Sequence, residues 1–106
     1  MVEMKEIRDL TSQIAREFSP DRIILFGSHA YGQPGNDSDV DILVVLPFEG
    51  KPVRKAIEIR NRVNAQVPLD LIVRTPEQVA DRLAQNDWFM RDVVEQGRTL
   101  YEAGHE

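Results

Sequence analysis

The chain has 106 residues, of which 42% are hydrophobic and 29% charged, and this is the composition of one globular domain, residues 1–106. It contains no cysteine, which excludes disulfide bonds and thiolate zinc sites. A net charge of −5 argues against direct binding of nucleic acid through its phosphates. No apolar run approaches the roughly 20 residues of a membrane-spanning helix, and the charged N-terminus does not resemble a signal peptide, so a cytoplasmic protein without membrane contact is expected.

The first half of the chain predicts one helix followed by two strands. Apolar residues recur at helical spacing over residues 3–18, which is typical of an amphipathic helix. A short apolar strand is expected at about residues 22–26. A longer strand, residues 39–46, has a continuous apolar run that indicates burial on both faces. Between the two strands, residues 27–32 predict a compact helical turn, and residues 33–38 have turn chemistry throughout.

A second helix is expected after the loop at residues 47–52, and it is predicted to end near Gln66. Its predicted buried side is marked by Val53, Ala56, Ile57 and Val63. The same stretch, residues 51–66, carries a local net charge of +4. We interpret this excess of Lys and Arg as a solvated helix face. A basic patch for an acidic partner or for nucleotide phosphates is the alternative.

The sequence next predicts a third strand and a third helix. Residues 69–73 form an apolar run of strand length. Thr75 and Gln78 have the spacing of a capping box, and a proline follows the threonine, so a helix is expected to begin there. Val79 and Leu83 are predicted to face inward from that helix.

A final helix is expected at about residues 87–96, with Gly97 as its C-terminal cap and residues 98–102 as an edge strand. Its predicted inward residues are Phe89, Val93 and Val94. Three large apolar residues in a row begin at Trp88, and one narrow helix face cannot bury them all. Trp88 is therefore a candidate for exposure to a partner, with core packing as the alternative. The whole pattern predicts an α/β domain with a mixed sheet of three or four strands flanked by helices.

Two aspartates at the start of the second strand, Asp39 and Asp41, are the strongest functional signal. Residues two apart in a strand point to one face, and like charges placed side by side repel unless a cation neutralises them. Gly27 and Ser28 directly follow the preceding strand. A glycine-containing turn there offers backbone amides to phosphate. The combination predicts a site for a nucleotide and a divalent cation.

Asp70 is the third notable carboxylate, because it lies inside an apolar strand where an unpaired charge is costly. If its strand neighbours that of Asp39 and Asp41, three carboxylates converge on two magnesium ions for in-line displacement at phosphorus. One ion would orient the triphosphate and stabilise the leaving pyrophosphate. The other would activate an acceptor hydroxyl, with Asp70 as its ligand or base. The alternatives are an ordinary glycine-serine turn, aspartates that cap a turn at a solvated strand end, and an Asp70 that is a satisfied core acid or pairs with Arg74 or Arg22.

These residues resemble the signature of minimal nucleotidyltransferases of the polymerase-beta superfamily. The signature is glycine-serine, a gap of about ten residues, Asp-x-Asp on a strand and a third acid nearby. The matching residues are Gly27, Ser28, Asp39, Asp41 and Asp70. The resemblance covers essentially the whole chain and implies the small nucleotidyltransferase fold. It implies magnesium-dependent transfer of AMP from ATP to a hydroxyl, with the glycine and serine binding nucleotide and the three aspartates catalytic and metal-binding.

Small stand-alone members of this superfamily are similar to the antitoxins of HEPN/MNT toxin–antitoxin pairs. The resemblance implies transfer of AMP to a tyrosine of a HEPN-domain ribonuclease toxin, which silences the toxin. The alternatives are an antitoxin that acts by binding alone and transfer to a small molecule. Many relatives carry arginine where His29 stands, and an ordinary loop histidine is the favoured interpretation. The helical domain of larger relatives is missing, so a partner is expected to complete the site.

Overall fold

A computed structural model describes residues 2–32, 35 and 38–104 of the chain. Its described residues form four helices and four strands. In chain order these are α1 (Met4–Phe18), β1 (Arg22–Phe26), β2 (Val40–Val45), α2 (Pro52–Arg62), β3 (Leu69–Arg74), α3 (Pro76–Ala84), α4 (Trp88–Gln96) and β4 (Arg98–Glu102). The predicted α/β class is therefore confirmed, and the edge strand expected at residues 98–102 is present.

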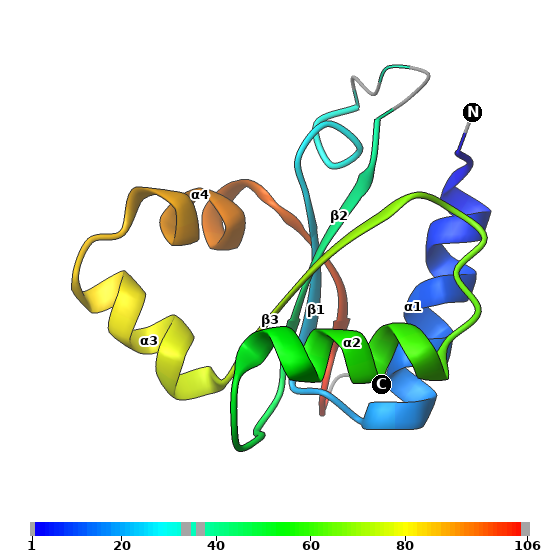
Figure 1. Cartoon of the computed structure of the whole chain (residues 1–106). Helices are drawn as coiled ribbons and strands as arrows, with labels where there is room; N and C mark the ends of the chain where they lie inside the picture. The colour runs from blue at the N-terminus through cyan, green and yellow to red at the C-terminus, as the bar shows by residue number, and fades with distance from the viewer. Residues whose placement is uncertain (1, 33–34, 36–37, 105–106) are drawn as a thin grey trace.

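The four described strands form one mixed sheet in the order β3-β2-β1-β4. β1 is antiparallel to both β2 and β4, whereas β2 and β3 are parallel and are connected through α2. Helices cover both faces of the sheet, with α1 and α2 on one side and α3 and α4 on the other (Figure 1). This order places β3 and β4 at the two edges.

Side chains of β2 alternate between two apolar cores. Even-numbered residues from Val40 to Val44 pack in the core beneath α1 and α2. Leu43 and Val45 pack in the core beneath α3 and α4. Because the side-chain period of a strand is two, Asp41 projects on the α3–α4 side of the sheet. The fold therefore assigns the candidate carboxylates to that side.

The second helix ends at Arg62, earlier than the predicted end near Gln66. Val63 is extended, with φ −104° and ψ 158°. The side chain of Gln13 in α1 explains this end, because it replaces the helical hydrogen bonds of Asn64. The Asn64 N–H donates to Gln13 Oε1 at 2.8 Å, and Gln13 Nε2 donates to the Asn64 carbonyl at 3.5 Å.

The predicted buried side of α2 is partly wrong. Val53 and Ile57 are 63% and 52% exposed, whereas Ile59 is fully buried. The helix buries a single stripe, residues Ala56, Ile59 and Val63, in the core. It lies beside β3, an edge strand, so in the described part of the chain no further element covers the other stripe. Apolar spacing alone does not tell which of two stripes faces the sheet.

The first turn of α4 also differs from the prediction. Phe89 was expected to face inward but is 41% exposed, and Met90 is buried in its place. Asp87 caps the helix, so residues three apart, Met90 and Val93, face the sheet. Trp88 is 79% exposed, which excludes core packing, the other of its two predicted alternatives. Phe89 packs edge-on against Phe26, with ring centroids 5.7 Å apart.

The predicted start of α3 is confirmed. The Gln78 N–H donates to Thr75 Oγ1 at 3.1 Å, and the Thr75 N–H donates to Gln78 Oε1 at 3.0 Å, which completes a capping box. Val79 is buried and Leu83 packs against the same core, as predicted. None of the helices over residues 2–32 and 38–104 has the length and apolarity that crossing a membrane requires.

Asp87 makes the stability of α4 depend on pH. The Met90 N–H donates to its carboxylate at 3.1 Å and Arg82 at 2.9 Å, and these two contacts lower the pKa of Asp87. A carboxyl whose pKa is lower in the folded state stabilises the fold above its unfolded pKa and loses this effect as pH falls through the folded pKa. Asp87→Asn retains a cap acceptor without the charge. We expect this variant to have a lower melting temperature than wild type at neutral pH and the same melting temperature in strong acid. A difference in melting temperature that does not change with pH would contradict this.

Candidate active site

The structure places Asp41 directly beside Asp70. The two residues are register partners in the parallel pair of β2 and β3, where neighbouring strands lie about 4.8 Å apart. Leu69 and Leu71 pack in the core beneath α1 and α2, so Asp70 faces the other side of the sheet, the same side as Asp41. The two strands are therefore neighbours, which is the condition under which Asp70 was expected to join the site. This pairing brings two carboxylates together at one end of the sheet.

Asp39 directly precedes β2, and its charge acts on Asp41. Val40, between the two aspartates, is fully buried. Because Asp39 precedes the strand, its projection beside Asp41 stays a prediction. Asp39 is exposed and Asp41 half-buried. Among the described residues, however, no three acidic or histidine side chains are grouped closely enough to hold one metal ion. The predicted convergence of all three carboxylates is therefore not present as a preformed cage.

The charge at Asp41 is poorly compensated. Burial raises the pKa of the Asp41 carboxyl, and the charge and hydrogen bond of Asp70 raise it further, with a smaller contribution from Asp39. His29 acts in the opposite direction. Such a pair of carboxylates is stabilised by a bound cation. Magnesium is held typically by one or two carboxylates together with substrate phosphates, so these residues fit a magnesium–nucleotide complex without a complete protein cage.

Gly27 makes room for the Asp41 carboxylate. Its φ of +73° is a conformation that side-chain-bearing residues rarely adopt. A Cβ built at this position would lie 2.1 Å from Asp41 Oδ2. A glycine is therefore required here for two reasons: the backbone has a positive φ, and a Cβ would collide with the Asp41 carboxylate. The sequence predicted a close approach of this backbone to a ligand, and the structure shows a close approach to the carboxylate.

The residues after Gly27 form the expected helical turn. The N–H groups of Ala30 and Tyr31 donate to the Gly27 carbonyl at 3.0 and 3.2 Å. In the described part of the chain, the amides of Ser28 and His29 have no acceptor, and they are the donors available to a phosphate.

His29 ties this turn to the start of the second strand. Its Nε2 lies 3.2 Å from the Ser38 carbonyl, which agrees with its interpretation as a loop histidine. Of the predicted turn at residues 33–38, residues 33–34 and 36–37 lie outside the described residues. At the described positions of that turn, the Ser38 N–H donates to the Gly35 carbonyl at 3.3 Å.

Asp70 has none of the ion-pair partners that the structural alternative required. Arg74 donates through Nη1 to the Val73 carbonyl at 2.7 Å. Arg22 lies at the far end of β1 from Phe26, the residue opposite Asp41. Within residues 38–104 and 2–32, Asp70 forms no ion pair with either arginine. The Asp70 carboxylate is therefore left exposed at the site, where a ligand can reach it.

The chain matches the nucleotidyltransferase domain family over residues 5–101. It belongs to this family. It is also 31% identical over 106 residues to MJ0604 of Methanocaldococcus jannaschii, which is named as a candidate protein adenylyltransferase; the alignment covers 95% of this chain and 100% of that protein. The chain is thus a nucleotidyltransferase, as the glycine-serine and Asp-x-Asp pattern predicted.

Solved structures share the fold of this nucleotidyltransferase. A candidate nucleotidyltransferase of Sulfolobus solfataricus has a TM-score of 0.65 at 20% identity, over 93% of this chain and 79% of the other. The toxin–antitoxin MntA–HpeT, in a variant with two aspartate-to-glutamate substitutions, has a TM-score of 0.59 at 19% identity, over 92% and 74%. A toxin–antitoxin with AMP-PNP has a TM-score of 0.56 at 20% identity, over 92% and 74%.

Sequence reasoning missed a contact that ties the turn of this nucleotidyltransferase to α4. The hydroxyl of Tyr31 donates to Asp92 Oδ2 at 2.8 Å. This hydrogen bond, more than burial, raises the pKa of Tyr31. Tyr31 was placed in the predicted turn, but nothing in the sequence indicated its partner, which lies 61 residues away.

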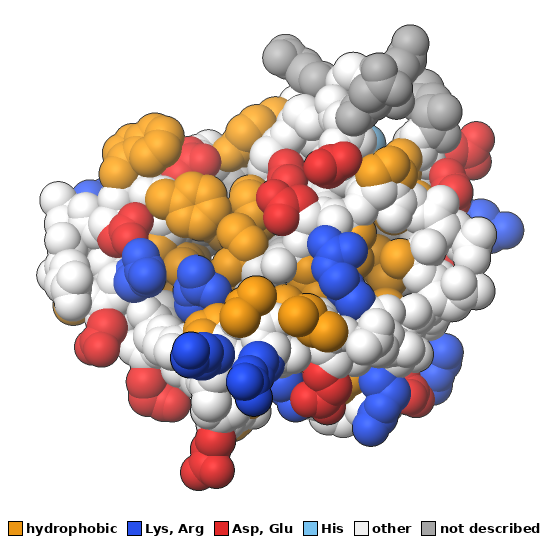
Figure 2. Space-filling model, in the orientation of Figure 1, with side chains coloured by type: hydrophobic (Ala, Val, Ile, Leu, Met, Phe, Trp, Pro, Cys, Tyr) orange, Lys and Arg blue, Asp and Glu red, His pale blue; other side chains and the backbone are white. Residues whose placement is uncertain are grey.

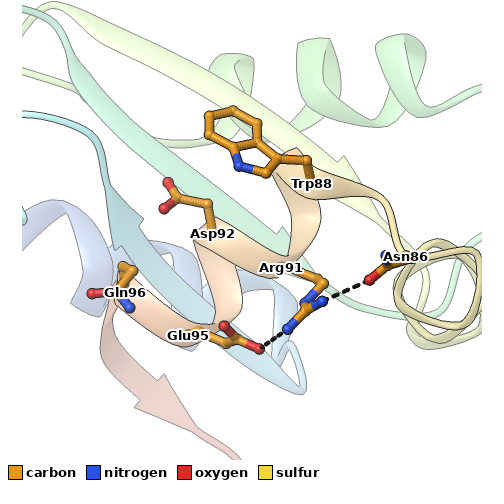
Figure 3. A pocket seen from close by; sticks show the side chains of 6 residues that line it. All are labelled: Asn86, Trp88, Arg91, Asp92, Glu95 and Gln96. Carbon is orange, nitrogen blue, oxygen red and sulfur yellow. Dashed lines mark hydrogen bonds and ion pairs between the residues drawn. The ribbon is translucent and has the colours of Figure 1, made fainter.

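Asp92 belongs to a shallow cavity of about 380 Å³ over α4. Trp88 and Asp92, one helical turn apart, lie on one side of the helix, and Arg91 turns away from them (Figure 3). Arg91 donates to Asn86 at 2.6 Å and to Glu95 at 3.4 Å, so its charge is already compensated. Among the residues that line this cavity, Arg91 is the one cation, and it is already paired, so the cavity has no free cation for a phosphate.

Tyr31→Phe is expected to weaken nucleotide binding by the nucleotidyltransferase more than its turnover. The variant loses the hydrogen bond to Asp92, so the turn is less firmly held. We expect KM for ATP to rise about three- to tenfold with a smaller change in kcat. Tyr101→Phe in β4 is the matched control. Equal effects of the two variants in steady-state kinetics would contradict this role.

Proposed function

We propose that the chain transfers AMP from ATP to a tyrosine hydroxyl of a HEPN-domain toxin and thereby acts as its antitoxin. One observation carries the proposal: the Asp41–Asp70 pair, beside a glycine turn with free amides. The relative named as a candidate protein adenylyltransferase supports a protein acceptor. The toxin–antitoxin structures of the same fold, one of them with AMP-PNP, support ATP as the donor and a toxin as the partner.

The described residues divide into a donor side and an acceptor side. On the donor side, the amides of Ser28 and His29 would hold phosphate oxygens, and Asp39 and Asp41 would supply hard oxygen ligands for magnesium. Bound magnesium would neutralise charge on the phosphates and on the leaving pyrophosphate. Asp70 is exposed on the outer strand β3, so it faces the acceptor. The acceptor oxygen attacks the α-phosphorus, the bond to pyrophosphate breaks, and the hydroxyl proton passes to the Asp70 carboxylate.

Asp70→Asn is expected to impair turnover far more than nucleotide binding. The substitution removes the proton acceptor on the acceptor side but leaves Asp39, Asp41 and the amide donors in place. General-base contributions are typically 10²–10⁴-fold, so we expect kcat to fall by about 10²-fold or more while the calorimetric affinity for an ATP analogue changes less than about threefold. An affinity that falls as far as the rate does would contradict this division.

The proposed function is tested by following label from α-labelled ATP. The protein is incubated with magnesium and with a small helical partner that contains an Arg-x4-His motif, encoded by the adjacent reading frame. We expect label on the partner with wild type and none with Asp39→Asn combined with Asp41→Asn. The absence of label on the partner, or undiminished label with the double variant, would overturn the proposal.

A second candidate is an antitoxin that neutralises its partner by binding alone. The observation in its favour is the exposed Trp88, 79% exposed at the start of α4. The same double variant separates the two candidates in growing cells. If it protects against the partner as well as wild type does, binding alone is sufficient; if protection is lost while the complex still forms, transfer is required.

A further inference from the structure

A groove of about 480 Å³ runs along the outer edge of β3, beside the start of α2. Its floor includes Leu71 and Ile72, and its wall includes Val53 of α2. Val53 and Ile57 are 63% and 52% exposed, which is unusual for two apolar residues one helical turn apart. Hydrophobic side chains gather on this face over β3 and α2, surrounded by Lys and Arg side chains, with acidic side chains above them (Figure 2).

The groove carries positive charge in a chain that is acidic overall. Two of its lining residues, Lys51 and Arg74, are cations, and none of its lining residues is acidic. The net charge of the whole chain is −5. The N-terminus of α2 lies beside the groove. It has no side-chain cap and no acidic residue in its first turn. The partial positive charge of the helix N-terminus therefore adds to the charge of Lys51 and Arg74. The groove is therefore complementary to a negatively charged segment.

At the β3 edge, the carbonyls of Leu69 and Val73 already accept hydrogen bonds from Arg60 and Arg74, so in the described part of the chain Leu71 supplies the backbone groups for an extended segment. The carbonyls of Pro68 and Arg74 accept hydrogen bonds from β2, from the N–H groups of Val40 and Leu46. Since successive residues of a parallel strand turn alternately to either side, the N–H and C=O of Leu71 point away from β2. An added strand pairs with such groups, as in peptide recognition by strand addition.

The groove and the candidate active site meet at the edge of β3, where Leu71 packs on the α1–α2 side of the sheet and the preceding residue, Asp70, faces the α3–α4 side. An extended segment rises about 3.3 Å per residue, so a few residues paired along β3 bring the next side chain to the Asp70 carboxylate. A bound segment would therefore place a hydroxyl on the acceptor side of the site.

We propose that this groove docks an acidic, extended segment of the acceptor protein and delivers its hydroxyl to Asp70. The proposal rests on the proposed transfer to a protein, and it names the surface and the chemistry by which that protein is recognised. Glutamate or aspartate side chains of the segment contact Lys51 and Arg74, and its apolar side chains cover Val53 and Ile57.

The test is a titration of ¹⁵N-labelled protein, without ATP, followed by NMR. The probes are three synthetic peptides with one tyrosine and the same apolar residues, flanked by glutamates, glutamines or lysines. We expect the glutamate peptide to bind at least about tenfold more tightly than the lysine peptide and to shift the amides of Leu71, Val73 and Val53. Lys51→Glu combined with Val53→Glu should weaken its binding about tenfold, because it reverses one charge and removes an apolar contact.

The matched control is Ser12→Glu combined with Arg16→Glu, which changes the net charge equally on exposed positions of α1. It is expected to bind the glutamate peptide as wild type does, and both variants are expected to bind ATP. Equal binding of the acidic and basic peptides, shifts confined to other elements, or equal weakening in the control would overturn the proposal. Self-association of wild type would also overturn the proposal if it is lost in Lys51→Glu combined with Val53→Glu and retained in the control. The groove would then be occupied by a second copy of the chain.

These outcomes are distinct from a failure of the proposed function. Peptide binding is measured without nucleotide, so it can succeed while AMP transfer to the partner fails. Conversely, AMP transfer by the groove variant at the wild-type rate, with the natural partner, would overturn the docking site and leave the transferase assignment intact.

Discussion

Asp41→Asn is expected to abolish nucleotidyl transfer and at the same time to raise the melting temperature of the ligand-free protein. The asparagine keeps the size of the side chain but removes a hard oxygen ligand for the metal–nucleotide complex. Loss of several kcal/mol of transition-state stabilisation corresponds to a fall in turnover of about 10³-fold. Label transfer from ATP and thermal melts without magnesium measure the two effects.

The rise in stability follows from the raised pKa of Asp41. Burial and the neighbouring Asp70 disfavour its charged form in the folded state. A carboxyl whose folded pKa is raised destabilises the fold progressively as pH rises from the unfolded to the folded pKa, and the full effect remains above that window. The neutral asparagine avoids this effect, so the difference from wild type should vanish in acid.

Asp81→Asn, on the exposed side of α3, is the control for the loss of a carboxylate. It is expected to change neither turnover nor the pH dependence of melting. We would reject the inference that a bound cation stabilises the Asp41–Asp70 pair if Asp41→Asn has a lower melting temperature than wild type at neutral pH, or if it retains turnover.

Gly27→Ala is expected to reduce both stability and turnover. At φ +73° the added Cβ strains the backbone, which costs about 1 kcal/mol or more. The Cβ also lies 2.1 Å from Asp41 Oδ2, so the carboxylate must move. Since misplacement by about 1 Å can reduce turnover about 10²-fold, we expect a loss of that order. Chemical denaturation and label transfer measure the two parts.

Gly50→Ala separates backbone strain from the collision with Asp41. Gly50 has a φ of +91°, and a Cβ there meets no atom within 4 Å. This control should therefore lose a similar amount of stability while retaining turnover. If Gly27→Ala and Gly50→Ala lose turnover equally, the loss in Gly27→Ala does not come from the collision with Asp41.

Local patterns were sufficient to predict most elements and the family of the chain. The capping box at Thr75 and Gln78 involves residues three apart, so it can be read from spacing alone. The sequence left open whether the strand of Asp70 neighbours that of Asp41, because strand order depends on the whole fold, and the parallel pairing of β2 and β3 brings the two carboxylates together. Family membership was predictable from the order of the glycine-serine and the aspartates, and the match over residues 5–101 confirms it.

Features that depend on distant partners were not predictable from local spacing. The end of α2 is fixed by Gln13, which lies 51 residues before Asn64. The exposed stripe of α2 depends on its position at a sheet edge, and sequence periodicity does not report that position. The hydrogen bond of Tyr31 to Asp92 likewise joins two elements that meet only in the folded protein. The groove beside β3 arises from the same edge position.

We propose that Asp41, beside Asp70, forms a site for magnesium and nucleotide together. This central claim is tested most directly by calorimetric titration of a non-hydrolysable ATP analogue with and without magnesium. We expect magnesium to tighten binding to wild type at least about tenfold and to have little effect on Asp41→Asn. Equal affinity with and without magnesium in wild type, or the same magnesium effect in Asp41→Asn, would contradict the claim.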